Sequence, residues 1–508
     1  MLGCHAMQVS HLNAPVETAP YEVRSTAPPG AAASAAGVAR CSHHLEPLLL
    51  MVWVLLNWGW VCWFGFTNDD FVWIAGADLS GRPDWWWQAF FPQRWSLGFF
   101  RPLVQLSFVL NYLACGLHPC GYYLVNVGLH AANAFFVWRL ALAVLDSPPA
   151  AMMTAMVFAV HPTETDAVAW VSGRTELLCA LFFLPAVLAH LKGRLGWALA
   201  LFALALCAKE SALSLPPVVL AADWCGLGKS RRLWRDAAAY GAVVVGYLLV
   251  RAATVQLFAM GVIGLHATAV GAPLRTWITL LGRFLLEPLP MHGFIRSAVM
   301  LSVGCAAALL YSRRCDARAG SAIRLALAWV VCTQLPYISW MRLYGLYLYL
   351  TVVGMSLLLV VLAVRLAGVV LRSWYRVLMP VGAALWLIGL MVHLQTANEY
   401  QRRASMLSLQ IVHSIVSAVP APPPHTLFVV TGVERLRIGA NAWVNNRGVL
   451  VFGLPEALQL WFRDRTLDVA YGSAPAATLR ERRPIIFVHW DEQTGTAHRI
   501  SPEPPVEK

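Results

Sequence analysis

Long apolar runs recur along almost the whole chain and restrict what it can fold into. The first run, Leu48 to Phe66, is long enough to cross about 30 Å of hydrocarbon, the thickness of a bilayer core. Of the 508 residues, 58% are hydrophobic and only 13% are charged, whereas soluble domains typically carry about 25% charged residues. The pattern excludes a chain that is water-soluble or disordered as a whole. It predicts a polytopic membrane protein of mainly α class.

Eleven membrane spans give the most consistent topology. We expect them at residues 48–66, 121–144, 150–163, 176–191, 195–208, 211–224, 237–257, 297–311, 322–338, 346–366 and 377–396. The segment 274–290 carries three charged residues, so we expect only a partly inserted outer helix there. With that assignment the basic loops all fall on one side of the membrane, as the positive-inside rule requires. The N-terminus is then cytoplasmic and the C-terminal end extracytoplasmic.

The formal net charge of +12 is concentrated in these short loops and does not form one basic face. We therefore expect the lipid bilayer as a partner and no nucleic acid. Cys115 and Cys120 flank a short turn in a loop on the outer side. A small disulfide and two free thiols both remain open for this pair.

Composition divides the chain into three parts. Residues 1–46 are rich in Ala, Pro and Ser and predict a disordered head. Residues 47–396 form the transmembrane unit, with a large first outer loop over 67–119. Residues 397–508 predict a small extracytoplasmic α/β domain. Its expected strands lie at 426–430, 449–452, 467–471 and 485–490, with a helix at 455–462.

Charged and polar residues concentrate in four groups that the eleven-span topology places on the outer face. Charged groups at membrane spans are costly and are therefore functional candidates. The groups are Asn68-Asp69-Asp70; Arg101 with Asn126 and His130; His161 and Glu164 with Arg174 and Glu176; and Lys209-Glu210. Each group alone has a structural explanation, such as a solvated interface acid, an arginine on a lipid headgroup, a turn histidine or a local ion pair. Their convergence on one face favours a functional site.

These residues resemble a known family. The strings Asn68-Asp69-Asp70, Phe100-Arg101-Pro102-Leu103 and Tyr123-Leu124-Val125-Asn126 resemble the GT-C membrane glycosyltransferases. The run from His161 to Leu178, HPTETDAVAWVSGRTELL, is the most specific match. It is similar to the transmembrane and tetratricopeptide-repeat O-mannosyltransferases and their bacterial relatives. The resemblance is strong over 67–224 and weak afterwards, and the tetratricopeptide repeats are absent.

The resemblance implies a GT-C-like helical bundle that moves a sugar, with mannose as one candidate, from a polyprenyl-phosphate donor to a hydroxyl acceptor. It implies a multi-pass protein of a bacterial inner membrane. The family's acidic general base falls on Asp69, with Asp70 as a second acid. A carboxylate can take the proton of the acceptor hydroxyl, and single displacement inverts the anomeric carbon.

Cations near the leaving phosphate are also needed, and three are available: Arg101, Arg174 and Lys209. The remaining polar residues of the four groups are the candidates for substrate binding: Asn126, His130, His161, Glu164, Glu176 and Glu210. The scheme requires no metal and no cofactor beyond the donor lipid, and the sequence shows no metal-ligand spacing. A protein and a glycolipid both remain open as acceptor.

Two other functions remain as alternatives. A transporter or lipid flippase would use charged residues deep within the membrane, whereas the charges here cluster at span ends. A non-catalytic membrane scaffold would use residues 397–508 as its binding module.

Overall fold

The computed structural model describes residues 45–78, 99–228, 233–254, 305–313, 315–337, 345–370, 375–433, 436–438, 447–450, 453–472 and 483–500. The chain divides into two compact units, Met1–Pro47 and Leu48–Lys508, and the fold below is that of the second. Most of the expected head, residues 1–44, and part of the first outer loop, residues 79–98, lie outside the described residues.

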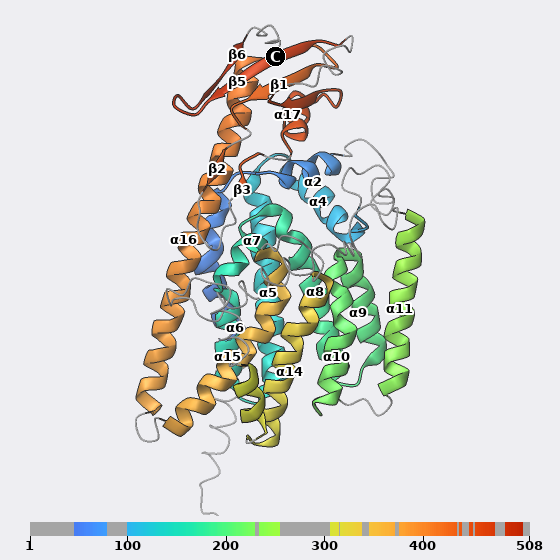
Figure 1. The fold of residues 1–508 in the computed structure, drawn as a ribbon, viewed down its shortest axis with the longest axis vertical. Helices are drawn as coiled ribbons and strands as arrows, with labels where there is room; N and C mark the ends of the chain where they lie inside the picture. The colour runs from blue at the N-terminus through green and yellow to red at the C-terminus, as the bar shows by residue number, and fades with distance from the viewer. Residues whose placement is uncertain are drawn as a thin grey trace, which may run out of the picture. The chain divides into compact units, whose positions relative to one another are not determined.

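The second unit is a helical bundle followed by a small sheet layer (Figure 1). The bundle contains a helix over 45–58, η1 (Gly59–Trp63), α2 (Asp69–Ala77), α4 (Pro102–Cys115), α5 (Pro119–Leu145), α6 (Pro148–Ala159), η3 (Pro162–Glu164), α7 (Thr165–Val168), η4 (Val171–Gly173), α8 (Arg174–Leu191), α9 (Leu195–Ala208), η5 (Glu210–Ser214), α10 (Leu215–Trp224), α11 (Leu233–Thr254), α14 (Ala317–Gln334), η6 (Leu335–Tyr337), η7 (Gly345–Leu348), α15 (Tyr349–Val370) and α16 (Tyr375–Ala418). The mainly α fold class is thus confirmed.

Local sequence accounts for several helix starts. Prolines open α4, α5 and α6, where a missing N–H costs no intrahelical hydrogen bond. The Asp316 side chain accepts a hydrogen bond from the Ala319 N–H at 2.9 Å and so caps α14. The apolar helix faces then pack into one core, in which Trp58, Trp329 and Tyr349 are among the fully buried large side chains.

Seven described helices are long and apolar enough to cross a membrane. They cover Leu45–Trp63, Pro119–Leu145, Val171–Leu191, Leu233–Ala253, Ala317–Tyr337, Gly345–Arg365 and Leu378–Ala418. The predicted spans at 150–163, 195–208 and 211–224 are helical but shorter, with 12, 14 and 10 residues in α6, α9 and α10. The predicted outer helix at 274–290 and most of the span at 297–311 lie outside the described residues. A multi-pass membrane protein follows, while the count of eleven stays a prediction.

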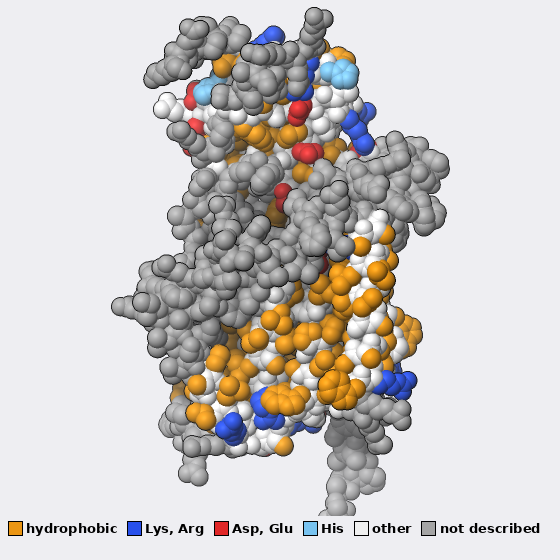
Figure 2. All heavy atoms as spheres, turned by 45° about the vertical axis from the view of Figure 1, so that its right-hand side comes forward, with side chains coloured by type: hydrophobic (Ala, Val, Ile, Leu, Met, Phe, Trp, Pro, Cys, Tyr) orange, Lys and Arg blue, Asp and Glu red, His pale blue; other side chains and the backbone are white. Residues whose placement is uncertain are grey.

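The surface agrees with a lipid-facing exterior. In the face drawn in Figure 2, hydrophobic side chains cover the helical part and Lys and Arg side chains gather at its lower end. Many large apolar side chains are exposed there, such as Leu249 on α11 and Leu385 on α16. In a bilayer these side chains meet acyl chains, which are as apolar as they are.

The C-terminal part is a small α/β layer, as the sequence predicts. Its main sheet has the order β4-β1-β5-β6, in which β4 and β5 flank β1 in parallel and β6 pairs with β5 antiparallel. The bounds are β1 (Leu427–Thr431), β4 (Asp468–Tyr471), β5 (Ile485–Asp491) and β6 (Thr496–Ile500), with α17 (Leu454–Phe462) before β4. A short antiparallel pair, β2 (Arg437–Ile438) and β3 (Arg447–Gly448), lies beside it. β2 and β6 were not predicted from the sequence. The strand expected at 449–452 is wrong in its described part, because Val449 and Leu450 form a turn after β3.

One continuous helix joins the bundle to this layer. α16 has 44 residues and runs across residue 397, where the sequence analysis placed the start of the C-terminal domain. Near its end, the Ser414 hydroxyl accepts a hydrogen bond from the Ala497 N–H at 2.6 Å. Gln410 donates to the Gly495 carbonyl at 3.0 Å. The sheet is therefore fixed to the last turns of α16.

The first outer loop contacts the C-terminal layer directly. The Thr67 hydroxyl donates to the Val449 carbonyl at 3.0 Å, and Arg465 contacts Asp78. At the start of α17, Gly453 has φ +86° and packs so closely that a Cβ would lie 2.1 Å from the Asn68 carbonyl oxygen. The cysteines of this region, Cys115 and Cys120, are free thiols in the structure.

Gly453→Ala is expected to disrupt this contact. The added Cβ requires a backbone conformation that L-residues rarely adopt, and it also collides with the Asn68 carbonyl oxygen. We expect a loss of about 1–3 kcal/mol of stability and faster proteolysis of the C-terminal layer in detergent. Gly246→Ala on α11 is the control, because its Cβ meets nothing within 4 Å. Equal protease sensitivity of the two variants would contradict the prediction.

Candidate functional site

The two adjacent acids of the first outer loop point to different surroundings. Asp69 and Asp70 open α2, where negative charge is favourable at a helix N-terminus. Asp70 is fully buried, whereas Asp69 is partly exposed. Asp69 is also near enough to Glu456 of α17 to contribute, after burial, to raising the pKa of that carboxyl. Asp69 therefore lies within electrostatic range of the C-terminal layer, and Asp70 faces the bundle.

Asp70 links the first outer loop to the start of α8. It accepts hydrogen bonds from the Thr67 N–H at 3.0 Å, from the Ser172 N–H at 2.8 Å and from the Ser172 hydroxyl at 2.6 Å. Burial raises the pKa of Asp70 to about 7, against the opposing effect of these hydrogen bonds. Although the sequence analysis expects Asp70 as a second catalytic acid, its oxygens are occupied by protein donors.

Arg174, expected at the donor phosphate, is also fully buried. Its guanidinium donates to the Asn126 side-chain oxygen at 3.0 Å, to that of Asn111 at 2.7 Å and to the Tyr122 carbonyl at 2.9 Å. It lies 4.5 Å from the centroid of the Phe108 ring. Neutral oxygens and aromatic faces thus surround this cation. Arg174 joins α4, α5 and α8.

Asn126 and His130, expected at the substrate, contact other parts of the bundle. Asn126 donates to the Trp170 and Val171 carbonyls at 3.1 and 3.3 Å. His130 is buried, with Nδ1 2.8 Å from the Tyr349 hydroxyl and Nε2 3.1 Å from the Ala159 carbonyl. These bonds hold α5 against the loop before α8 and against α15.

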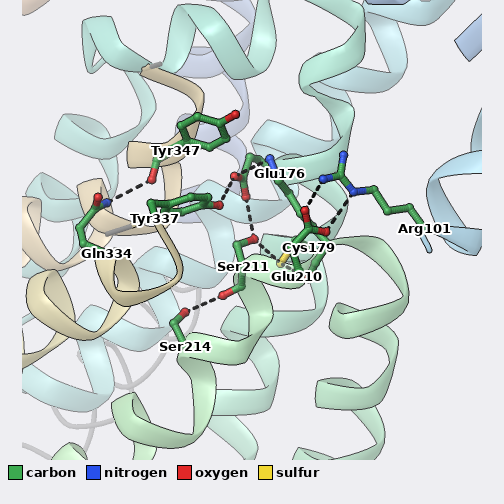
Figure 3. Close-up of polar contacts among 10 residues, drawn as sticks. Arg101, Glu176, Cys179, Glu210, Ser211, Ser214, Gln334, Tyr337 and Tyr347 are labelled. Atoms are coloured by element: carbon green, nitrogen blue, oxygen red, sulfur yellow. Dashed lines mark hydrogen bonds and ion pairs between the residues drawn. The ribbon is translucent and has the colours of Figure 1, made fainter. Parts of the chain in front are cut away.

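Four expected site residues form two buried ion pairs beside each other (Figure 3). Arg101 binds the Glu210 carboxylate through two nitrogens, with Nε 3.1 Å from Oε2. Lys209 lies with its Nζ 2.8 Å from Glu176 Oε1. The side chains are only 2–12% exposed. Two carboxylates and two cations from three chain segments are thus concentrated in one low-dielectric place.

The neighbouring cations favour the ionised form of Glu210. Burial alone would raise the pKa of Glu210, but attraction and hydrogen bonds from Arg101, with Lys209 nearby, lower it to about 2. Opposite charges within about 4 Å favour the charged form in this way. The two carboxylates accordingly fix the two cations in position.

Several partners of this cluster were missed by sequence reasoning. The Tyr337 hydroxyl donates to Glu176 at 2.8 Å, and Ser211 donates to Glu176 at 3.1 Å. The Lys209 Nζ lies 5.1 Å from the centroid of the Tyr347 ring. Tyr337 and Tyr347 come from the segments around η6 and η7, far along the chain. The tyrosine-rich composition of 337–349 is the only signal that could have identified them.

His161 and Glu164 occupy the turn between α6 and α7. His161 caps η3, where its Nδ1 accepts from the Thr163 N–H at 3.3 Å. Glu164 is fully buried, and neither carboxyl oxygen has a hydrogen-bond partner among the described residues. Burial, with the charges of Glu176 and Asp166, raises the pKa of Glu164 well above its usual value. A buried carboxyl that favours its protonated form therefore lies near the two ion pairs.

The fold is of the GT-C type. It is similar to the crystal structure of ArnT from Cupriavidus metallidurans bound to undecaprenyl phosphate, with a TM-score of 0.51 and 14% sequence identity over 90% of this chain and 94% of that one. This likeness concerns the architecture.

The sequence is similar to protein O-mannosyl-transferases. It is 38% identical to Tmtc1 of Drosophila melanogaster over 135 residues, which are 25% of this chain and 16% of the relative. It is 36% identical to TMTC4 of Homo sapiens over 163 residues, which are 26% of this chain and 22% of the relative. The chain thus matches less than a quarter of the length of these two relatives. No protein-family model matches it. The predicted resemblance to GT-C O-mannosyltransferases is confirmed.

Asp70→Asn is expected to change how stability depends on pH. Since the folded-state pKa of Asp70 is raised to about 7 from 3.8, the folded protein binds this proton more tightly than the unfolded chain does. Its contribution to stability is then fully present below about pH 4 and is lost as pH rises through 7. The Tm of the wild type minus that of the variant should fall between pH 5 and pH 8 and change little above that. A difference that rises over this range would contradict a buried, proton-retaining Asp70.

Proposed function

We propose that this protein is a membrane glycosyltransferase that moves a sugar from a polyprenyl-phosphate donor to a hydroxyl acceptor on the extracytoplasmic face of a bacterial inner membrane. Mannose is the first candidate sugar, because the relatives are named O-mannosyl-transferases. A polyprenyl phosphate is the candidate carrier, because the structurally similar ArnT was crystallised with undecaprenyl phosphate.

The observation that carries this proposal is the pair of buried ion pairs, Arg101–Glu210 and Lys209–Glu176. Buried ion pairs contribute little net stability, since desolvation offsets the attraction. Charges placed close to apolar spans are therefore a sign of function. Arg101 uses Nε and Nη2 for Glu210, so its Nη1 is the atom proposed for a phosphate oxygen, and Lys209 offers a compact second cation. Both cations suit a polyprenyl monophosphate, which leaves as an anion.

Asp69 is the proposed general base. It lies at the N-terminus of α2, is partly exposed, and is within electrostatic range of the C-terminal layer. The acceptor hydroxyl gives its proton to the Asp69 carboxylate while its oxygen forms a bond to the anomeric carbon. The bond from that carbon to the phosphate oxygen breaks on the opposite side, so the configuration inverts. Arg101 and Lys209 stabilise the charge that develops on the departing polyprenyl phosphate.

Buried residues behind the site position these groups. Asp70 holds the α2 start against Ser172, and Arg174 holds the same turn against α4 and α5. We assign both residues to positioning, because they are fully buried and their hydrogen bonds join separate helices to one another. The protonated form of the Glu164 carboxyl is suited to donating a hydrogen bond to a sugar oxygen.

Asp69→Asn should abolish transfer without lowering the amount of protein in the membrane. The test complements a strain that lacks the gene with the wild type or the variant at matched levels, and compares envelope proteins and lipids by mass spectrometry. A sugar that only the wild type restores supports the enzyme and identifies the acceptor class. Glu492→Gln, an exposed acid in the C-terminal layer, is the control. Full restoration by Asp69→Asn would remove Asp69 as the base and favour a scaffold.

A double substitution distinguishes a structural role of the Arg101–Glu210 pair from a role in transfer. Arg101→Gln alone leaves Glu210 buried and unpaired, which costs about 3–5 kcal/mol, so we expect low abundance. Adding Glu210→Gln removes the buried charge and should restore the amount of folded protein. Transfer should stay at least about 100-fold below wild type, since the phosphate has lost the positive charge of Arg101. Recovery of both abundance and transfer would make the pair structural only.

A further inference from the structure

Three helix ends meet at a second cluster of titratable side chains, remote from the outer ion pairs. His190 lies in the last turn of α8, Asp223 near the end of α10, and Asp236 in the first turn of α11. One ligand atom from each residue lies within 4.8 Å of the others. Glu176 stands at the opposite end of α8, about 20 Å away by the rise of the helix. The cluster is therefore separate from the proposed catalytic site.

The imidazole of His190 is held in a fixed orientation. Its Nε2 lies 3.0 Å from Asp223 Oδ2, and its Nδ1 lies 3.1 Å from the Tyr240 hydroxyl. A metal-binding histidine typically uses one ring nitrogen as ligand while the other donates to an oxygen nearby. Tyr240, one turn after Asp236 on α11, provides that oxygen.

The charge of the cluster is incompletely compensated by the described residues. The side chains of His190 and Asp223 are 2% and 6% exposed, and Asp236 is 9% exposed. The Oδ1 atom of Asp223 is buried without a hydrogen-bond partner among the described residues. Two carboxylates this close repel each other. A divalent cation would neutralise both.

We propose that His190, Asp223 and Asp236 bind one divalent transition-metal ion, which fastens the first turn of α11 to the ends of α8 and α10. One imidazole nitrogen and two carboxylate oxygens suit Zn²⁺ or Mn²⁺, with water completing the coordination.

The packing of α11 explains what such an ion would do. In the apolar stretch of this helix only 17% is buried, against 78% in the span that contains α8. Figure 1 shows α11 at the edge of the bundle, beside α9. A helix with so few buried contacts is stabilised more by a metal bridge to its neighbours than a central helix would be. The ion has a structural role and takes no part in sugar transfer.

Metal binding by the full-length protein in detergent tests the proposal. After removal of metals with a chelator, Zn²⁺ and Mn²⁺ are titrated separately while binding and Tm are followed, and the metal content of untreated protein is measured. We expect one equivalent of either ion to bind and the Tm to rise by a few degrees. Failure of both ions to bind would show that the cluster is only a hydrogen-bonded His–Asp pair.

Variants assign the binding to these residues. Asp236→Asn and His190→Gln should each weaken binding at least about tenfold and abolish the rise in Tm. Tyr240→Phe should weaken it about tenfold. Asp146→Asn, an exposed acid paired with Arg318, is the control and should bind as the wild type does. Since Asp236 accepts no hydrogen bond from a described residue, Asp236→Asn keeps the test valid if His190→Gln fails to fold. Unchanged affinity in Asp236→Asn would overturn the proposal.

Discussion

The arrangement of helices at one end of the bundle depends on opposite charges that are buried together, away from water. Burial removes water from Arg101, Glu176, Lys209 and Glu210, and the attraction between partners offsets this desolvation cost. The pairs thereby fix the residue before α4, the first turn of α8 and the turn between α9 and η5 relative to one another. Helices that slide easily in lipid thus acquire a single register at this level.

Around this cluster, the proposed positioning roles and the proposed catalytic roles belong to different residues. Arg174 and Asp70 are at least as deeply buried as the residues of the ion pairs. Their partners, however, are backbone groups, side-chain amides and hydroxyls. Asp69, the neighbour of Asp70, instead lies within electrostatic range of α17. Adjacent residues on a helix diverge by about 100°, so a single dipeptide can anchor a loop and present a carboxylate at the same time.

The sequence was informative where physical rules act locally. Apolar runs predicted the helices, alternating residues predicted β1, β4 and β5, and charged residues near span ends included all four members of the ion pairs. The sequence could not show which charged residues form ion pairs, because Lys209 is adjacent to Glu210 in sequence but binds Glu176. It could not separate short buried helices such as α6 and α9 from full spans, since both are equally apolar. His190, Asp223 and Asp236 escaped notice because their proximity arises only when α8, α10 and α11 pack.

The length of α16 has a consequence for the reach of the protein. A helix of 44 residues is about 66 Å long, roughly twice the thickness of the hydrocarbon core. The final turns of α16 are hydrogen-bonded to the hairpin of β5 and β6. The distance of the sheet from the start of α16 is therefore set by the number of helical turns. Each turn added or removed would raise or lower that layer by about 5.4 Å and rotate it little. The number of turns in α16 therefore sets how far the C-terminal layer lies from the opposite end of the bundle.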